Sequence, residues 1–213
     1  MLPQVSQFHI FKFQATALLH FSQIKNKMND KIVISICGAA GAGKSTLAKK
    51  LVKELGEDMA SRIPGDYYLK SYNGEPLEDY MNTPFKYDWE MIQQVINTPI
   101  GLAAETPDFD FNKLMRINKS GGKPFTIRRY MIIDTMLPYP KSNYIFRMTA
   151  PEDLRLKNIK ERDKAQKTNS ARNWEKMEVT AKELTSRKIR FNMELSAFNE
   201  FEINVGKIID YLK

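Results

Sequence analysis

Apolar and polar residues follow two different periods along this 213-residue chain. The largely apolar residues 31–37 predict a buried strand, and the apolar spacing over 46–55 predicts an amphipathic helix directly after it. By the same criteria, further strands are predicted at 62–69, 125–133, 144–149 and 200–204. Further helices are predicted at 88–96, from 151 onward, at 174–197 and at 205–212, with irregular segments at 70–86 and 98–123. Strands interleaved with helices predict an α/β fold, with three α/β/α layers around a five-stranded parallel sheet.

The first 27 residues differ in composition from the rest of the chain. Residues 1–27 are rich in Phe and Leu and nearly free of acidic residues, so we treat them as an N-terminal extension of unassigned role. They fit a secretory signal poorly, since no basic residue precedes the apolar stretch and no small-residue cleavage site follows it. A start at Met28, a mitochondrial address and an extra element packed on the domain all remain open. Residues 28–213 are predicted to form one domain.

Composition narrows the classes of partner. The net charge is +8, but the basic residues are spread along the chain as far as Lys213 without a basic and aromatic module, so we expect no nucleic-acid partner. No apolar run is long enough to span a bilayer, which predicts no membrane partner. The single cysteine, Cys37, favours a cytoplasmic setting and a place in the core. The only histidines, His9 and His20, lie in the extension, so neither metal ligation nor acid–base catalysis by histidine is expected.

Residues 38–45 read Gly-Ala-Ala-Gly-Ala-Gly-Lys-Ser, a complete phosphate-loop (P-loop, Walker A) motif between the predicted strand and helix. This context directs successive backbone N–H groups at one anion, which predicts binding of a nucleoside triphosphate. Lys44 can reach the β- and γ-phosphates, and the Ser45 hydroxyl can ligate Mg²⁺. The predicted ATP-binding residues are Gly38, Ala39, Ala40, Gly41, Ala42, Gly43, Lys44, Ser45 and Thr46.

Two further features lie downstream of the loop. The predicted strand 125–133 ends in Asp134, whose carboxylate can hold Mg²⁺ directly or through water, although capping a helix is an ordinary alternative for such an Asp. Residues 155–175 are rich in Lys and Arg and predict a helical lid that closes over a triphosphate and excludes water. A solvated basic helix face is the other reading of this charge run.

Three classes of P-loop protein were weighed against these features. A GTPase is disfavoured because residues 118–121 read Asn-Lys-Ser-Gly without the Asp of the base-reading motif, and residues 134–137 lack the Gly expected after the metal strand. A nucleic-acid or motor ATPase is disfavoured because it normally needs a larger core and sensor elements, for which 213 residues leave little room. A kinase must keep water from the reacting phosphate, which the basic lid would do. The pattern therefore favours a small-molecule kinase.

Over residues 31 to about 205 the chain resembles the uridine kinase-like family, which includes uridine/cytidine, pantothenate and nicotinamide riboside kinases and phosphoribulokinase. Besides the P-loop, the resemblance is carried by residues 65–69 (Gly-Asp-Tyr-Tyr-Leu), 87–89 (Tyr-Asp-Trp), 107–111 (Pro-Asp-Phe-Asp-Phe), 132–134 (Ile-Ile-Asp), 155–156, 162–163 and 198–203. It implies an ATP- and Mg²⁺-dependent kinase of a small-molecule hydroxyl. The implied acceptor is a nucleoside such as uridine or cytidine, with pantothenate or a sugar phosphate as the alternative. A nucleotide-binding regulator without turnover, and a homo-oligomer, stay open.

The resemblance also assigns roles to residues. Asp66 would be the general base, and Arg162 would approach the transferring phosphoryl group. The acceptor pocket would be lined by Tyr68, Tyr87, Phe109, Asp110 and Arg116. The chain departs from the family at Asp134-Thr135, where Glu-Gly is usual, and at Asn158-Ile159, where uridine kinases tend to carry two arginines. Some relatives place the catalytic Asp one position earlier, where this chain has Gly65.

Overall fold

A computed structural model describes residues 30–76, 79–80, 86–166, 178, 189–198 and 200–213. The chain divides into two units, Met1–Lys31 and Ile32–Lys213, and the fold below is that of the second unit. The extension predicted at 1–27 lies outside the described residues. Within the described residues, no helix is long and apolar enough to cross a membrane.

A parallel sheet of five strands forms the centre of the fold, in the order β2-β5-β1-β6-β7. The strands are β1 (Ile32–Cys37), β2 (Ala60–Pro64), β5 (Tyr130–Asp134), β6 (Tyr144–Thr149) and β7 (Met193–Ser196). Because Asp134 lies opposite Ile36 of β1 and Pro64 of β2, these three strands end at the same edge of the sheet. Ligands bind at this edge in open α/β sheets.

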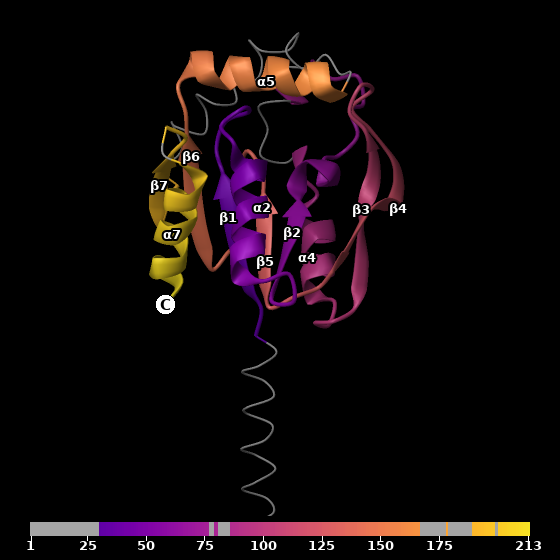
Figure 1. The fold of residues 1–213 in the computed structure, drawn as a ribbon. Helices are drawn as coiled ribbons and strands as arrows, with labels where there is room; N and C mark the ends of the chain where they lie inside the picture. Colours follow the sequence, from indigo (N-terminus) through magenta and orange to yellow (C-terminus); the bar gives the residue numbers. More distant parts are fainter. Residues whose placement is uncertain (1–29, 77–78, 81–85, 167–177, 179–188, 199) are drawn as a thin grey trace, which may run out of the picture. The chain divides into compact units, whose positions relative to one another are not determined.

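Helices cover both faces of the sheet (Figure 1). Ile34 and Ile36 of β1 belong to one apolar core with α2 (Lys44–Leu55) and α7 (Phe201–Leu212). Val33, on the opposite face of the same strand, belongs to a second core with Ile92 and Ile96 of α4 (Trp89–Asn97). These two cores confirm the three-layer α/β/α prediction. α5 (Glu152–Gln166) lies across the end of the sheet where β1 and β5 finish (Figure 1).

The fifth strand lies elsewhere than predicted. Residues 200–204, predicted as a strand, instead include the first turn of α7, while β7 lies within the segment 174–197 predicted as helix. Phe201, Val205 and Ile208 all pack in one apolar core, and their spacing of four and then three positions is that of a helix. The part of the predicted helix over 189–197 is not helical, Glu178 is helical, and the rest lies outside the described residues.

A hairpin replaces the irregular segment predicted at 98–123. β3 (Ala103–Asp110) and β4 (Met115–Thr126) pair antiparallel in a separate sheet of two strands. β4 is mostly exposed, so backbone pairing and not an apolar alternation marks it as a strand. The single strand predicted at 125–133 is therefore wrong, because these residues contain the end of β4 and the start of β5.

Cys37 is fully buried at the end of β1, as expected for a core residue. Burial raises the pKa of its thiol to about 12. Because the reactive thiolate is then scarce at pH 8, we expect iodoacetamide to modify Cys37 about 10³-fold more slowly in the folded protein than in urea. Mass spectrometry of timed samples measures this ratio. Equal rates in the two conditions would contradict the buried position.

Candidate functional site

The P-loop leaves β1 at the common edge of the sheet and enters α2 at Lys44. Gly43, with φ of 87°, caps the helix in the left-handed region. Gly41 has φ of 77°, and a Cβ there would lie 2.3 Å from the backbone oxygen of Arg155. In the described part of the chain, no side chain caps α2 and its first turn holds no acidic residue. Its N-terminal N–H groups are therefore suited to an anion.

Lys44 lies buried among charged groups of other elements. Its Nζ donates to the Ala39 carbonyl oxygen of the loop at 2.9 Å. Burial lowers the pKa of Lys44, and the neighbouring carboxylates of Asp66 and Asp134 oppose that shift. Arg162 of α5 also acts on the pKa of Lys44, in the lowering direction. Four predicted site residues from four elements thus lie near enough for the charges of Asp66, Asp134 and Arg162 to act on Lys44.

Asp134 ends β5 and is only 4% exposed. The Ser45 hydroxyl donates to its Oδ2 at 2.5 Å. Arg62 of β2 donates from Nε to Oδ1 at 2.8 Å and from a terminal nitrogen to Oδ2 at 2.7 Å. Burial raises the pKa of Asp134, and the hydrogen bonds from Arg62 and Ser45 oppose that shift. Asp134 is therefore held from both sides and does not cap a helix.

The donor set beside the loop suits Mg²⁺, which prefers hard oxygen ligands. It offers the Ser45 hydroxyl and the Asp134 carboxylate, whose oxygens already accept hydrogen bonds from Arg62. Among the described residues, no group of three or more His, Cys, Asp or Glu could hold a metal. Mg²⁺ at this place would therefore depend on nucleotide and water oxygens for its remaining ligands.

Arg62 did not figure among the predicted site residues. Its signal in the sequence is a basic residue within a short strand that also contains Ala60, Ile63 and Pro64. Such a residue is expected to find a carboxylate partner, since a buried charge is costly without one. The neighbouring strand that supplies this partner follows only from the sheet order.

Asp66 lies in η1 (Gly65–Tyr68), a short 3-10 helix directly after β2. The strand predicted at 62–69 therefore ends at Pro64, and its second half is helical. A Cβ at Gly65 would lie 2.0 Å from Cγ2 of Thr135, so this turn packs closely against the end of β5. Asp66 is exposed, and its Oδ1 accepts a hydrogen bond from the Tyr87 hydroxyl at 3.2 Å.

The predicted lid contacts the P-loop through the first half of α5. The side-chain amide of Asn158 donates to the Gly41 carbonyl oxygen at 2.8 Å. Arg155, at the start of the predicted lid, is buried and bonded to Glu178 and to the Ala150 carbonyl oxygen, so it is not directed to a ligand. Arg162 is exposed. Of the segment 155–175, residues 167–175 lie outside the described part.

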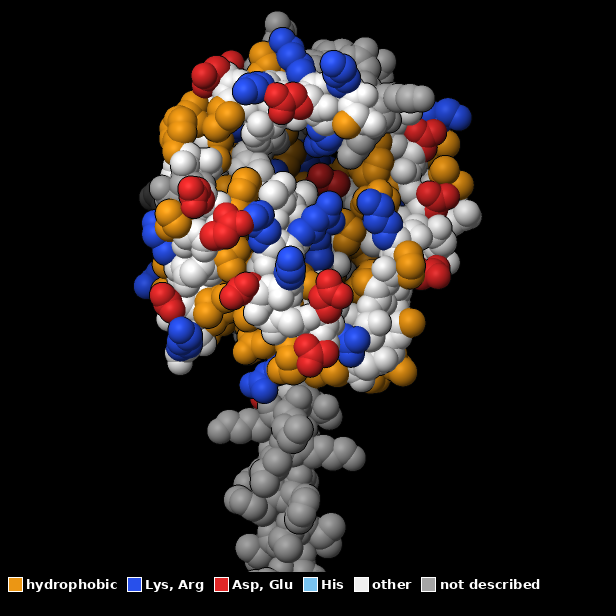
Figure 2. Space-filling view, in the orientation of Figure 1, with side chains coloured by type: hydrophobic (Ala, Val, Ile, Leu, Met, Phe, Trp, Pro, Cys, Tyr) orange, Lys and Arg blue, Asp and Glu red, His pale blue; other side chains and the backbone are white. Residues whose placement is uncertain are grey.

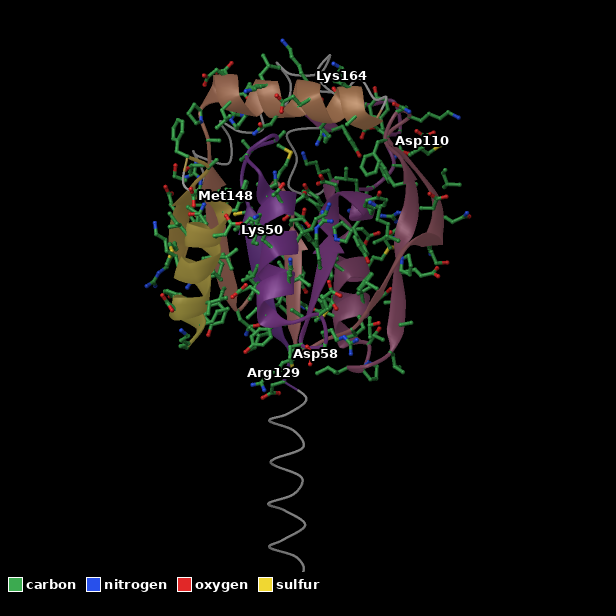
Figure 3. The ribbon with its side chains drawn as sticks, in the orientation of Figure 1. Lys50, Asp58, Asp110, Arg129, Met148 and Lys164 are labelled. Carbon is green, nitrogen blue, oxygen red and sulfur yellow. The ribbon has the colours of Figure 1, made fainter. Side chains whose placement is uncertain are left out.

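The five residues predicted to line an acceptor pocket lie in different surroundings. Tyr68 and Tyr87 are buried at 0% and 1% exposure, and Phe109 is 5% exposed. Asp110 accepts from the backbone N–H groups of Asn112 and Lys113 and so closes the turn of the hairpin. Figure 3 shows Asp110 at the same end of the molecule as Lys164 of α5.

Arg116 of β4 is held by Asp88, the residue that caps α4. A terminal nitrogen of Arg116 donates to Asp88 Oδ2 at 2.9 Å, and another donates to the Leu69 carbonyl oxygen at 2.9 Å. These bonds fasten the hairpin to the segment that follows Asp66. Tyr67, which was not predicted as a site residue, meets Phe111 edge to face at a centroid distance of 5.1 Å. A role in acceptor binding stays a prediction for this group.

The surface is hollowed beneath α5, and basic and acidic side chains lie in the hollow (Figure 2). The end of the sheet that carries the P-loop lies at the same level (Figure 1). A hollow with charged walls at a helix N-terminus can concentrate a phosphorylated ligand, because low-dielectric walls strengthen the attraction between charges. The arrangement is chemically suited to bind a triphosphate, with the exposed Asp66 carboxylate nearby.

Comparisons with known proteins agree with this reading of the P-loop. The chain is 33% identical over 88 residues to uridine kinase from Halobacterium salinarum, covering 39% of each chain. It is 32% identical over 95 residues to uridine kinase from Clostridium perfringens, covering 42% of this chain and 46% of that one. The aligned parts thus span less than half of these relatives. A family described as RNA helicase matches residues 34–116, which include the P-loop.

Solved structures confirm the fold. A candidate fructose transport system kinase from Silicibacter sp. TM1040 superposes with a TM-score of 0.57 at 16% identity, covering 78% of this chain and 90% of that chain. The YGR205w protein gives a TM-score of 0.51 at 13% identity, covering 89% of this chain and 94% of that chain. The chain thus shares the fold of these two structures, and part of its sequence resembles uridine kinases.

Proposed function

We propose that this chain, which resembles uridine kinases in sequence and P-loop kinases in fold, transfers the γ-phosphate of ATP to a hydroxyl group of a small molecule. The observation that carries the proposal is the cluster of Lys44, Asp66 and Asp134 around the N-terminus of α2. Lys44 supplies positive charge for the triphosphate, and Asp66 is the exposed carboxylate beside it. ATP binding alone would not require a second, exposed carboxylate at the loop.

In the proposed reaction, Asp66 accepts the proton of the acceptor hydroxyl while the oxygen of that hydroxyl bonds to the γ-phosphorus. The bond between the γ-phosphorus and its bridging oxygen to the β-phosphate breaks, and ADP leaves. Lys44 and the N–H groups at the start of α2 stabilise charge on the phosphate oxygens. Arg162 approaches the transferring group from α5, and α5 keeps water out.

Mg²⁺ is part of this proposal. When bound, it would neutralise the phosphate oxygens and orient the triphosphate. Ser45 would be its direct protein ligand, and Asp134 would hold its water ligands, because both Asp134 oxygens already accept from Arg62. This division of roles is consistent with the coordination of Mg²⁺, which usually keeps several water ligands.

A nucleoside such as uridine or cytidine is the proposed acceptor. The named relatives support it, while pantothenate or a sugar phosphate is the alternative. Phe109, Asp110, Arg116 and Tyr68 remain proposed acceptor-side residues. We also propose a cytoplasmic protein without membrane or nucleic-acid partners, whose oligomeric state the sequence leaves open.

The match to the RNA helicase family favours a nucleic-acid ATPase as a second candidate function. The match covers residues 34–116, and these contain the strand, loop and helix that P-loop proteins share. It ends before Asp134 and before α5. The two candidates differ in what stimulates ATP turnover, which is a polynucleotide for one and a small alcohol for the other. A regulator would turn over with neither.

A coupled ADP-release assay of the purified chain distinguishes these candidates. The panel holds nucleosides, pantothenate and sugar phosphates, with single-stranded RNA as the competing class and a reaction without acceptor as the blank. We expect at least one small alcohol to raise ADP release well above the blank, and uridine or cytidine to give the largest increase. Stimulation by RNA alone would favour the ATPase, and a flat panel would favour the regulator.

A further inference from the structure

On the basis of the kinase function proposed above, we infer that Tyr87 is a positioning residue that fixes Asp66 relative to the P-loop. Tyr87 belongs to the segment between η1 and α4 and is 1% exposed. Its hydroxyl is already bonded to protein groups on two sides, the Asp66 carboxylate and the Met136 backbone N–H, so it is not left for an acceptor. Its hydroxyl contacts Asp66, so the geometry points to a supporting role behind the base.

The direction of the hydrogen bond between Tyr87 and Asp66 follows from its neighbours. The backbone N–H of Met136 donates to the Tyr87 hydroxyl oxygen at 3.0 Å. A phenol carries one hydrogen, and the N–H of Met136 cannot accept it. The hydroxyl hydrogen is therefore available to the Asp66 carboxylate, whose Oδ1 lies 3.2 Å away. Burial raises the pKa of Tyr87, and the Asp66 carboxylate raises it further, so the phenol stays a donor at working pH.

The same hydrogen-bond chain reaches the P-loop. The backbone N–H of Gly38, the first residue of the loop, donates to the Met136 carbonyl oxygen at 3.2 Å. Met136 is thus bonded to the loop through its carbonyl and to Tyr87 through its N–H. Three consecutive hydrogen bonds connect Gly38 to Asp66. They fix the separation between the phosphate-binding backbone and the base.

The ring of Tyr87 is held on other sides as well. It stacks on Trp89 with a centroid distance of 4.7 Å, and the Lys86 ammonium lies 5.8 Å from its centroid. Its backbone forms a bridge with Leu69, three residues after Asp66. A ring held in this way can keep its hydroxyl at one place, so that Asp66 and not Tyr87 adjusts to the hydrogen bond.

This contact matters because the terminal torsion of an Asp side chain is soft, with a broad energy minimum. With Oδ1 held by Tyr87, the Asp66 carboxylate has a defined plane, and Oδ2 is the oxygen left for an acceptor hydroxyl. Asp66 itself is exposed, and within the described residues its side chain accepts no hydrogen bond other than the one from Tyr87. Preorganisation of a base in this way contributes to the rate and leaves ATP binding unaffected.

The test replaces Tyr87→Phe, with Tyr139→Phe as the matched control. Tyr139 is also buried and also contacts Trp89, but its hydroxyl donates to Gln93. The first readout is the side-chain carboxyl ¹³C resonance of Asp66, assigned by its loss in Asp66→Asn. We expect Tyr87→Phe to move this resonance and Tyr139→Phe to leave it in place. The second readout is kinetic, with kcat lowered about fivefold to tenfold by Tyr87→Phe at a KM for ATP within about twofold of wild type.

Each outcome bears on the inference. If the Asp66 resonance is unchanged in Tyr87→Phe, or shifts equally in Tyr139→Phe, the hydrogen bond between Tyr87 and Asp66 is overturned. A moved resonance with unchanged kcat would overturn the positioning role while the proposed reaction stands. A wild-type protein that transfers phosphate to no acceptor of the panel would instead overturn the proposed function, and with it the catalytic part of this inference, even where the resonance responds.

Discussion

Asp66→Asn is expected to lower the rate of phosphoryl transfer by about 10²-fold to 10⁴-fold, the usual contribution of a positioned general base. The amide has the shape of the carboxylate, and its oxygen still accepts from the Tyr87 hydroxyl. What it loses is the ability to take up the acceptor proton. The P-loop and Lys44 are untouched, so the dissociation constant for ATP is expected to change by no more than about twofold.

Single-turnover kinetics with saturating acceptor, and titration with a fluorescent ATP analogue, measure the two effects. Asp58→Asn is the matched control, since Asp58 is an exposed carboxylate at the end of the molecule opposite Asp110 (Figure 3). We expect it to retain the wild-type rate. Transfer by Asp66→Asn at the wild-type rate would reject Asp66 as the base and leave the P-loop assignment intact.

Arg62→Met is expected to destabilise the protein by about 3 kcal/mol, because it removes the cation that is hydrogen-bonded to the buried Asp134 carboxylate. Asp134 is 4% exposed, and within the described residues its carboxylate accepts two hydrogen bonds from Arg62 and one from Ser45. The remaining bond, from the Ser45 hydroxyl, cannot compensate for a buried charge. Urea denaturation followed by circular dichroism measures the free energy of unfolding.

Two further variants separate charge burial from lost packing. Arg147→Met breaks an ion pair whose partner Glu194 is 57% exposed, and we expect it to cost less than about 1 kcal/mol. The double variant Arg62→Met with Asp134→Asn removes the uncompensated charge, so it should be more stable than Arg62→Met alone. If the double variant is less stable than Arg62→Met, then Arg62 does not stabilise the protein by offsetting the buried charge of Asp134.

The P-loop and the strand before it were predictable because their signals are local. A glycine-rich turn between a buried strand and an amphipathic helix is written in consecutive residues, and the structure confirms both flanks at β1 and α2. Asp134 was found in the same way, from an apolar strand that ends in a carboxylate. The number of strands in the sheet and their parallel direction were also predicted correctly, although the last strand was misplaced.

The elements that were predicted wrongly are mainly those stabilised by contacts with other parts of the chain. β4 is mostly exposed and is held by pairing with β3, so its composition resembles that of a loop. β7 has four residues and gains its place only by pairing with β6. Its short apolar pattern is compatible with either period, and so is that of residues 200–204 at the start of α7.

The contacts of the site depend on neighbours that are distant in sequence. Arg62 meets Asp134 because β2 and β5 are adjacent, and Tyr87 meets Asp66 because its segment folds back on η1. The resemblance to the uridine kinase-like family suggested a pocket wall at Tyr87, whereas its hydrogen bonds to Asp66 and Met136 are the basis for the supporting role proposed above. Neither pair could be read from spacing.

The most direct test of the account is a crystal structure of the protein with Mg²⁺ and a non-hydrolysable ATP analogue. We expect the β- and γ-phosphates against the N-terminus of α2, with Lys44 Nζ moved from the Ala39 carbonyl to the γ-phosphate and Asp66 across from it. A nucleotide bound away from residues 38–45, or an Asp66 carboxylate directed away from the γ-phosphate, would contradict it.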